Sequence, residues 1–182
     1  GHVLAFIATL DRPERVGVVP ELAHAAMAGL HPAYEVAHAL YAGKLFGVHL
    51  NAQRPLRFDQ DLRFGGANLK DSFFVVQLLE EENWPGPRSF DAHPYRTTDE
   101  QGVWEFVKGC IRAYQILAEK VRQFREDPEV QELLHQIRQW DEMADPHEAA
   151  APEGSVRRVF LYERLDHLVF EILMGTRSSG RG

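Results

Sequence analysis

The chain has 182 residues, a length that suits one domain with a substantial hydrophobic core. Apolar residues make up 45% and charged residues 26%, which is typical of a soluble globular protein. The formal net charge of −7 argues against binding to nucleic acid, and a single cysteine leaves no disulfide framework and no cysteine-based zinc site. No apolar run is long enough to cross a membrane and no signal peptide is expected, so we expect a cytoplasmic protein.

The first half of the chain alternates helical patterns with short apolar runs. The β-branched run VGVV predicts a buried strand, and two further runs predict a second strand and a weaker third one. Asn68 is the predicted N-cap of the helix that follows it. The expected elements are a helix at 3–10, a strand at 16–19, a helix at 32–43, a strand at 44–50, a polar loop to residue 66, a helix at 68–83 and a strand at 87–93.

The second half of the chain contains helical patterns only. Thr97 or Thr98 is expected to cap the first of these helices, and Pro128 to close it. Gly175 is expected to end the last helix. The expected elements are a helix at 97–127, a helix at 129–143, a linker at 144–155, a helix at 156–175 and a disordered tail.

Strands that alternate with helices predict parallel βαβ units. Three strands are too few for a doubly wound sheet, and no G-x-G-x-x-G motif follows the first strand, so a nucleotide-binding fold is excluded. The fold that remains is α/β: a partial TIM (β/α) barrel with a helical C-terminal arm. We expect a half-barrel region at 1–96, an interface-forming helical arm at 97–175 and a disordered tail at 176–182. Unpaired strand edges favour completion of this imperfect barrel by dimerisation.

Acidic and imidazole side chains follow each of the three predicted strands. In a barrel the C-terminal ends of the strands meet at one rim, so these side chains are expected to converge. Carboxylates with an imidazole suit Mg²⁺, Mn²⁺ or Co²⁺. A solvated acidic rim with chance histidines is the alternative. The candidates are Glu21 and His24 after the first strand, His49, Asp59 and Asp61 after the second, and Asp91 and His93 at the third.

Several ordered motifs together resemble the C-terminal half of a xylose isomerase, of the shorter actinobacterial and Thermus-type branch. The motifs are PELAHAAMAGL, ALYAGKLFGVHLNAQ, FDQDLRFG, GPRSFDAH, GVWEFVKGCIRAYQIL, REDPEV and ERLDHL. The resemblance implies a TIM-barrel enzyme of an oligomeric family that holds two divalent metals and interconverts aldoses and ketoses by a hydride shift. It also implies roles for five of the candidates. Glu21 matches the carboxylate that bridges both metals, His24, Asp59 and Asp61 match ligands of the catalytic metal, and Asp91 matches a ligand of the structural metal.

The chain also departs from the family's pattern. His49 stands where the family has an aspartate that binds the structural metal, and Val19 and Pro20 precede the bridging glutamate in place of the usual asparagine. The resemblance further implies that a ring-opening His–Asp pair, a substrate lysine and another metal ligand lie in the half that has no counterpart here. His49 and His93 are the remaining acid–base candidates, because both can titrate near neutrality at the rim.

Three functions remain open from the sequence. The first is a xylose isomerase-like protein of sugar metabolism with little or no ordinary isomerase activity, which binds one metal or none. The second is an active divalent-metal-dependent isomerase of xylose or glucose, with a site shared in a dimer. The third is an oligomerisation or interaction module. The expected partners are a second copy of the chain and a pentose or hexose, with no nucleic acid and no membrane.

Overall fold

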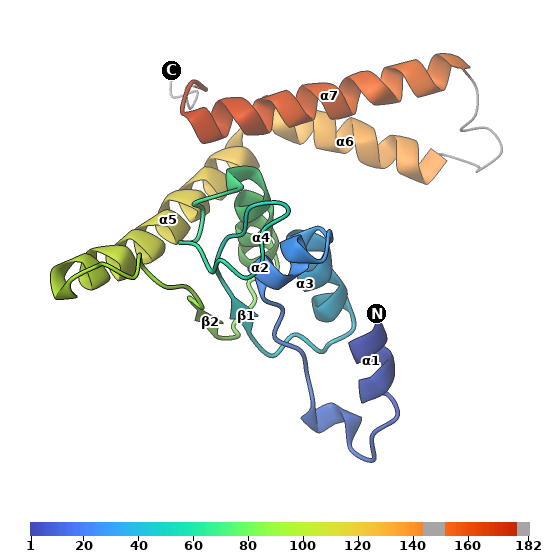
Figure 1. The fold of residues 1–182 in the computed structure, drawn as a ribbon. Helices are drawn as coiled ribbons and strands as arrows, with labels where there is room; N and C mark the ends of the chain where they lie inside the picture. Colours follow the sequence, from blue (N-terminus) through green and yellow to red (C-terminus); the bar gives the residue numbers. More distant parts are fainter. Residues whose placement is uncertain (144–151, 178–182) are drawn as a thin grey trace. The chain divides into compact units, whose positions relative to one another are not determined.

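The computed structural model describes residues 1–143 and 152–177. They fall into two compact units, Gly1–Ala118 and Glu119–Gly182, with α5 beginning in the first and ending in the second. Within the described residues, no helix is both long and apolar enough to cross a membrane. The elements are α1 His2–Ile7, a 3-10 turn Pro13–Arg15, α2 Leu22–Met27, α3 Pro32–Tyr41, β1 Val48–His49, α4 Leu69–Glu81, β2 Arg88–Ser89, α5 Glu100–Glu126, α6 Pro128–Met143 and α7 Pro152–Met174 (Figure 1).

A small parallel sheet forms the centre of the first unit. Strands β1 and β2 pair in register, with Val48 opposite Arg88. The segment before α2 runs parallel to β1 through two isolated bridges, Val18 to Leu45 and Glu21 to His49. The predicted parallel order of three extended segments is therefore present, and the described residues form this sheet without a closed barrel.

The strands are shorter than the sequence predicted. The expected strand at 16–19 is reduced to bridges, and those at 44–50 and 87–93 are reduced to two residues each. Proline explains part of the difference. Pro20 and Pro87 have no amide hydrogen, so the ladder contains only their carbonyls, which accept from the amides of His49 (3.0 Å) and Val48 (3.1 Å).

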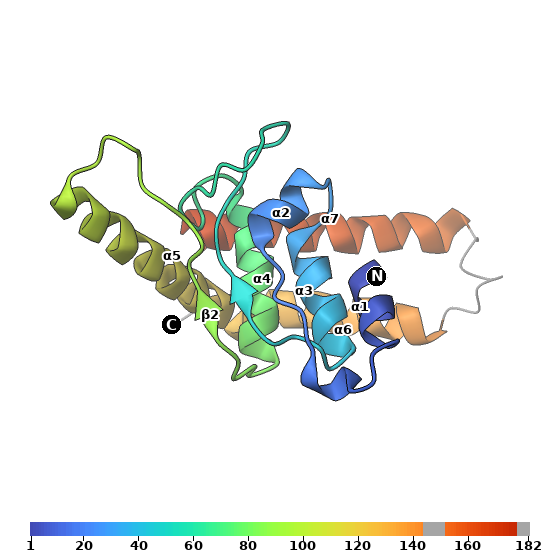
Figure 2. The same cartoon turned by 60° about the horizontal axis from the view of Figure 1, so that its bottom comes forward.

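Helices cover one side of this sheet. Helix α3 packs against α2 and α4, and the views in Figures 1 and 2 agree on α3 and α4 lying side by side. Asn68 caps α4 as predicted, with its side chain accepting from the amide of Asp71 at 3.2 Å. The core of this unit is apolar and close to fully buried. Its largest members include Val36, Val48, Leu50, Phe64, Phe73, Val76 and Leu79.

The N-terminal part of α5 contacts α4 through a polar and aromatic cluster. The Tyr114 hydroxyl donates to Glu80 at 2.6 Å. Burial, followed by this hydrogen bond, raises the pKa of Tyr114 above its ordinary value. The guanidinium of Arg88 lies 5.5 Å from the centre of the Trp84 ring and 5.8 Å from that of Tyr114. The cluster therefore fastens α5 beside the end of the sheet.

The boundaries of the C-terminal helices differ from the sequence expectation. Asp99, rather than Thr97 or Thr98, caps α5 by accepting from the Gly102 amide at 2.8 Å. Pro128 begins α6 instead of merely closing α5, a position where proline is favoured because its missing amide hydrogen costs nothing. Helix α7 begins at Pro152 rather than 156. Most of the predicted linker, residues 144–151, lies outside the described residues.

In the second unit, α6 and α7 pack against each other and run in opposite directions (Figure 1). Their facing residues are apolar, which explains the pairing because each amphipathic helix buries one stripe on the other. Gly175 ends α7 as predicted, with a left-handed φ of 71°. The buried residues are Val130, Leu133, Ile137, Leu161, Leu168, Val169 and Ile172.

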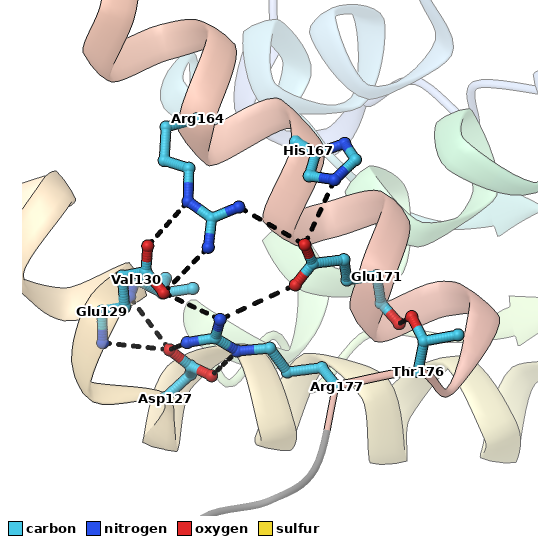
Figure 3. A network of polar contacts seen from close by, with 8 residues as sticks. All are labelled: Asp127, Glu129, Val130, Arg164, His167, Glu171, Thr176 and Arg177. Atoms are coloured by element: carbon cyan, nitrogen blue, oxygen red, sulfur yellow. Dashed lines mark hydrogen bonds and ion pairs between the residues drawn. The ribbon is translucent and has the colours of Figure 1, made fainter.

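Ion pairs close the end of this helical hairpin (Figure 3). The first two residues of the predicted tail make defined contacts, and residues 178–182 lie outside the described part. The Arg177 guanidinium contacts Asp127 at 2.6 Å and Glu129 at 2.7 Å, while Arg164 contacts Glu129 at 2.7 Å and Glu171 at 3.3 Å. Asp127 also accepts from the amides of Glu129 (3.0 Å) and Val130 (3.1 Å), as an N-cap.

These contacts hold two carboxylates in the charged form. Burial works to raise the pKa of Asp127, but the Arg177 guanidinium and the Val130 amide outweigh it and leave that pKa below its ordinary value. The Arg164 and Arg177 hydrogen bonds likewise lower the pKa of Glu129. The stability that the Asp127 charge contributes is therefore fully present above the ordinary carboxyl pKa of about 4 and is lost as the pH falls through the lowered value.

Asp127→Asn tests this contribution, because asparagine keeps the cap and removes the charge. We expect the variant to lose about 1–3 kcal/mol of unfolding free energy at pH 7 and to depend less on pH below about 4. Urea unfolding followed by circular dichroism from pH 7 to 3 measures both. Glu142→Gln, at an exposed position of α6, is the matched control. Equal pH profiles for Asp127→Asn and the original chain would contradict the assignment.

Candidate metal centre

The candidate site lies where the parallel segments of the first unit end. Glu21 is the N-cap residue of α2 and pairs with His49 through a parallel bridge, while His24 lies in the first turn of α2. Asp91 follows β2 by two residues. The prediction that these strand ends bring acidic and imidazole groups together therefore agrees with the arrangement of the described residues.

Two groups of side chains converge on Glu21. One contains Glu21, His24 and Asp59, and the other contains Glu21, His49 and Asp91. Within each group, one ligand atom per residue lies within 4.8 Å of the others. His24 Nε2 is 3.3 Å from Glu21 Oε1 and 3.1 Å from Asp59 Oδ1. His49 Nδ1 is 2.9 Å from Asp91 Oδ2 and 3.9 Å from Glu21 Oε2. The two oxygens of Glu21 thus face different groups.

The loop that carries Asp59 and Asp61 has a constrained backbone. Both aspartates have a left-handed φ, of 42° and 43°, a conformation that costs energy for most residues and is tolerated best by Asn and Asp. The buried side chain of Gln53 holds the loop by donating to the Arg57 carbonyl (2.6 Å) and accepting from the Gln60 amide (2.9 Å). These two hydrogen bonds constrain the backbone on both sides of Asp59.

The residue that organises the site is Asn51, which is not among the candidates predicted from the sequence. Its side chain is 1% exposed. Its Oδ1 accepts from the Ala23 amide at 2.7 Å. The two hydrogens of its Nδ2 are shared among three acceptors, Glu21 Oε1 (2.8 Å), Asp61 Oδ1 (3.0 Å) and the Asp91 carbonyl (2.8 Å). A search for charged and imidazole groups cannot find a neutral amide. The available signal was an asparagine two residues after His49, at the end of a buried strand.

Asp61 and His93, two of the predicted site residues, lie outside both groups of side chains. Asp61 contacts Asn51 and belongs to neither ligand group, and its backbone carbonyl accepts from the His93 amide at 3.2 Å. The His93 ring faces the Pro94 carbonyl at 3.3 Å. The roles of Asp61 as a ligand and of His93 in catalysis stay predictions.

The donor set fits a divalent cation. Ligand atoms at about 2.1 Å from an ion lie about 3.0–3.4 Å from each other in octahedral or tetrahedral geometry. Three of the four measured separations, 2.9, 3.1 and 3.3 Å, lie in or next to this range, and the Glu21–His49 separation of 3.9 Å is wider. Ligand oxygens of Glu21 and Asp59, and of Glu21 and Asp91, lie within 4.8 Å of each other, and a cation relieves the repulsion between such carboxylates.

Curated relatives match nearly all of the chain. It is 53% identical to a xylose isomerase of Thermus thermophilus and 51% identical to one of Thermus caldophilus, in each case over 191 aligned residues. It is 42% identical to a xylose isomerase of Streptomyces lividans. The alignments cover 97% of this chain and 48–49% of the relatives. No family model matches.

The chain resembles one half of a xylose isomerase. It spans about half the length of the curated relatives it matches. The resemblance inferred from the sequence motifs is therefore confirmed at the level of a xylose isomerase-like half. At the candidate site, Asn51 contacts Glu21, which is shared by both groups, and the backbone of Asp91 in the second group.

Asn51→Asp tests the part of Asn51 in the site. The change replaces the donor to Glu21 and Asp61 with another carboxylate, so we expect the metal-free variant to lose at least about 2 kcal/mol of unfolding free energy. Mn²⁺ should restore part of this loss. Urea unfolding with and without Mn²⁺ measures the effect, with Asn83→Asp at an exposed position as the control. A variant as stable as that control would show that Asn51 does not organise the site.

Proposed function

We propose that the chain is a xylose isomerase-like protein of sugar metabolism that binds one divalent cation, Mg²⁺, Mn²⁺ or Co²⁺, and has little or no ordinary xylose isomerase activity. The observation that carries the proposal is the convergence of His24 and Asp59 on one oxygen-rich side of Glu21. Glu21, His24 and Asp59 hold the cation, with Asp61 next to them. The names of the relatives, xylose isomerases, support the substrate class, an aldose.

A bound cation supplies Lewis-acid polarisation of sugar oxygens, which is the chemistry of aldose–ketose isomerisation with metals. The chain's own residues contribute orientation. Asn51 fixes the rotamer of Glu21 through its amide, and Gln53 fixes the loop of Asp59. Such a buried amide lets the carboxylates keep one geometry before a ligand arrives, which favours tight binding.

Low activity is proposed because the second group departs from the pattern of the family. His49 replaces an acidic ligand, and its Nδ1 lies 3.9 Å from Glu21 while it contacts Asp91 at 2.9 Å. A single misplaced electrostatic group typically costs about 10²–10³ in rate. Activity with a site shared in a dimer is the alternative, with His49 and His93 as acid–base candidates. An interaction module that binds no cation is the other alternative.

A homodimer in the cytoplasm is the proposed assembly, with a pentose or hexose as ligand. Apolar side chains along the outer segment of the sheet support it. The exposed fractions are 38% for Val16, 47% for Val19 and 44% for Phe46. The segment that contains Val16 and Val19 pairs with the segment at 45–49, and its opposite edge has no partner strand among the described residues. Burying these side chains against a second copy removes apolar surface from water. Light scattering should give twice the chain mass of 20.8 kDa, and a monomer at micromolar concentration would overturn it.

Calorimetric titration of the chelator-stripped chain with Mn²⁺ and Co²⁺ tests the cation site. We expect binding that Asp59→Ala/Asp61→Ala weakens by about 100-fold or more, since a ligand is removed. Asp11→Ala/Glu14→Ala removes the same charge from exposed positions and is the control. A ketose assay with xylose and glucose follows. Binding with no ketose formed agrees with the proposal, ketose formation favours the alternative enzyme, and absent binding overturns both in favour of the interaction module.

The same titration, with Mg²⁺ as competitor, measures whether His24 faces the cation. His24→Asp makes the group of Glu21, His24 and Asp59 all oxygen, so we expect the preference for Co²⁺ over Mg²⁺ to fall, because imidazole suits borderline ions and Mg²⁺ favours oxygen. His93→Asp makes the same change outside both groups and should leave the preference as it was. An equal shift in both variants would mean that added charge, rather than ligation by His24, changes the preference.

A further inference from the structure

A cavity of the first unit lies beside the loop that carries Asp59 and Asp61, here called the aspartate loop, and has a different chemistry from the candidate metal centre. Its volume is about 480 Å³, within the usual range of small-molecule sites. Three segments build it: the loop at 54–66, the stretch at 93–98 after β2, and the first turns of α5. Neither the metal proposal nor the resemblance gives this cavity a role.

Three arginines are among the residues that line the cavity, Arg54, Arg63 and Arg96. Within residues 1–143 and 152–177 none of them forms an ion pair with a carboxylate. The one carboxylate of the lining, Glu105, is paired with Lys108 at 2.8 Å. In a chain of net charge −7, the lining thus carries a local excess of two positive charges.

Backbone and packing contacts hold the arginines in place. The segments of Arg54 and Arg63 are joined by an antiparallel bridge between Ala52 and Leu62, with both hydrogen bonds at 2.9 Å. The Arg63 side chain lies on α5 at Gly109, where an added Cβ would be 3.3 Å from its Cδ and 3.4 Å from its Nη1. A glycine inside a helix costs about 1 kcal/mol relative to alanine, and here it leaves room for this arginine.

The stretch that carries Arg96 is tied to the same loop. The amide of His93 donates to the Asp61 carbonyl at 3.2 Å, so the segments on both sides of the cavity share a hydrogen bond. Tyr95 and Thr98 add hydroxyl groups to the lining. Isolated exposed arginines are ordinarily solvated, but three that line one cavity from two segments match an anion with several acceptor oxygens.

We propose that this cavity binds a phosphate monoester through Arg54, Arg63 and Arg96. A dianionic phosphate compensates the local excess of two positive charges, and its oxygens accept the paired N–H groups of guanidinium forks. The proposal does not require a metal or any isomerase activity. Free phosphate and a phosphorylated sugar share this chemistry, and the volume of the cavity accommodates either.

Calorimetry with inorganic phosphate, in chelator and 150 mM NaCl, tests the proposal on the full chain. We expect saturable binding that Arg63→Gln and Arg96→Gln each weaken about tenfold or more, the loss typical of one charge-assisted hydrogen bond. Arg57→Gln removes the same charge from an exposed position of the same loop outside the cavity lining, and is expected to bind as the original chain does. Circular dichroism confirms folding, and Arg96→Gln keeps the test valid where Arg63→Gln disturbs α5.

The outcomes separate the possible sources of phosphate. Tighter binding of xylulose 5-phosphate than of inorganic phosphate, with no competition by xylose, assigns the cavity to a phosphorylated sugar. Equal affinities assign it to free phosphate, and both results support the site. Absent binding at 10 mM phosphate, or equal losses in Arg57→Gln and Arg96→Gln, overturns it. Because metal is removed throughout, failure here leaves the cation titration unaffected.

Discussion

The amide of Asn51 is the contact on which the centre of the first unit depends. It lies at the end of β1 and reaches α2 through the Ala23 amide, the aspartate loop through Asp61 and the stretch after β2 through the Asp91 carbonyl. The extended segments that meet here have only a few ladder hydrogen bonds of their own. One buried side chain with all its hydrogen bonds formed therefore does what longer strands do in a larger sheet.

The same contact sets the electrostatics of the candidate metal centre. Glu21, Asp59, Asp61 and Asp91 bring several carboxylates to one place, and Asn51 offers them a dipole but no charge. His24 and His49 stand on either side of Glu21. A site of this composition is neutralised only by a cation or by protons, which is why cation binding is the function we favour for it.

The candidate metal centre and the cavity lined by three arginines lie on either side of the aspartate loop and carry opposite charge. Side chains of Asp59 and Asp61 face the acidic centre, whereas Gln60, Leu62 and Arg63 line the arginine cavity. The left-handed φ of Asp59 and Asp61 turns the backbone at both residues, so one short loop places side chains at both sites. In the second unit, by contrast, opposite charges meet directly, and the ion pairs of Arg164 and Arg177 close a helical hairpin.

Local signals in the sequence determined the helices, their order and several of their ends. The cap at Asn68 and the stop at Gly175 were readable because each depends on residues within one turn. The parallel order of three extended segments and the gathering of Glu21, His24, His49, Asp59 and Asp91 also followed from the alternation of elements. The ordered motifs identified the xylose isomerase resemblance, because they depend on sequence alone.

Other features were decided only by tertiary structure. The lengths of the strands depend on which neighbours supply hydrogen bonds, and Pro20 and Pro87 limited them. The hub role of Asn51 arises from partners 10 to 40 residues away along the chain, so no local pattern marks it. The division of Glu21 between two groups, the left-handed loop of Asp59 and the convergence of three arginines likewise depend on distant contacts. The sequence determined which acidic and imidazole side chains follow the extended segments, and packing determined which of their atoms meet.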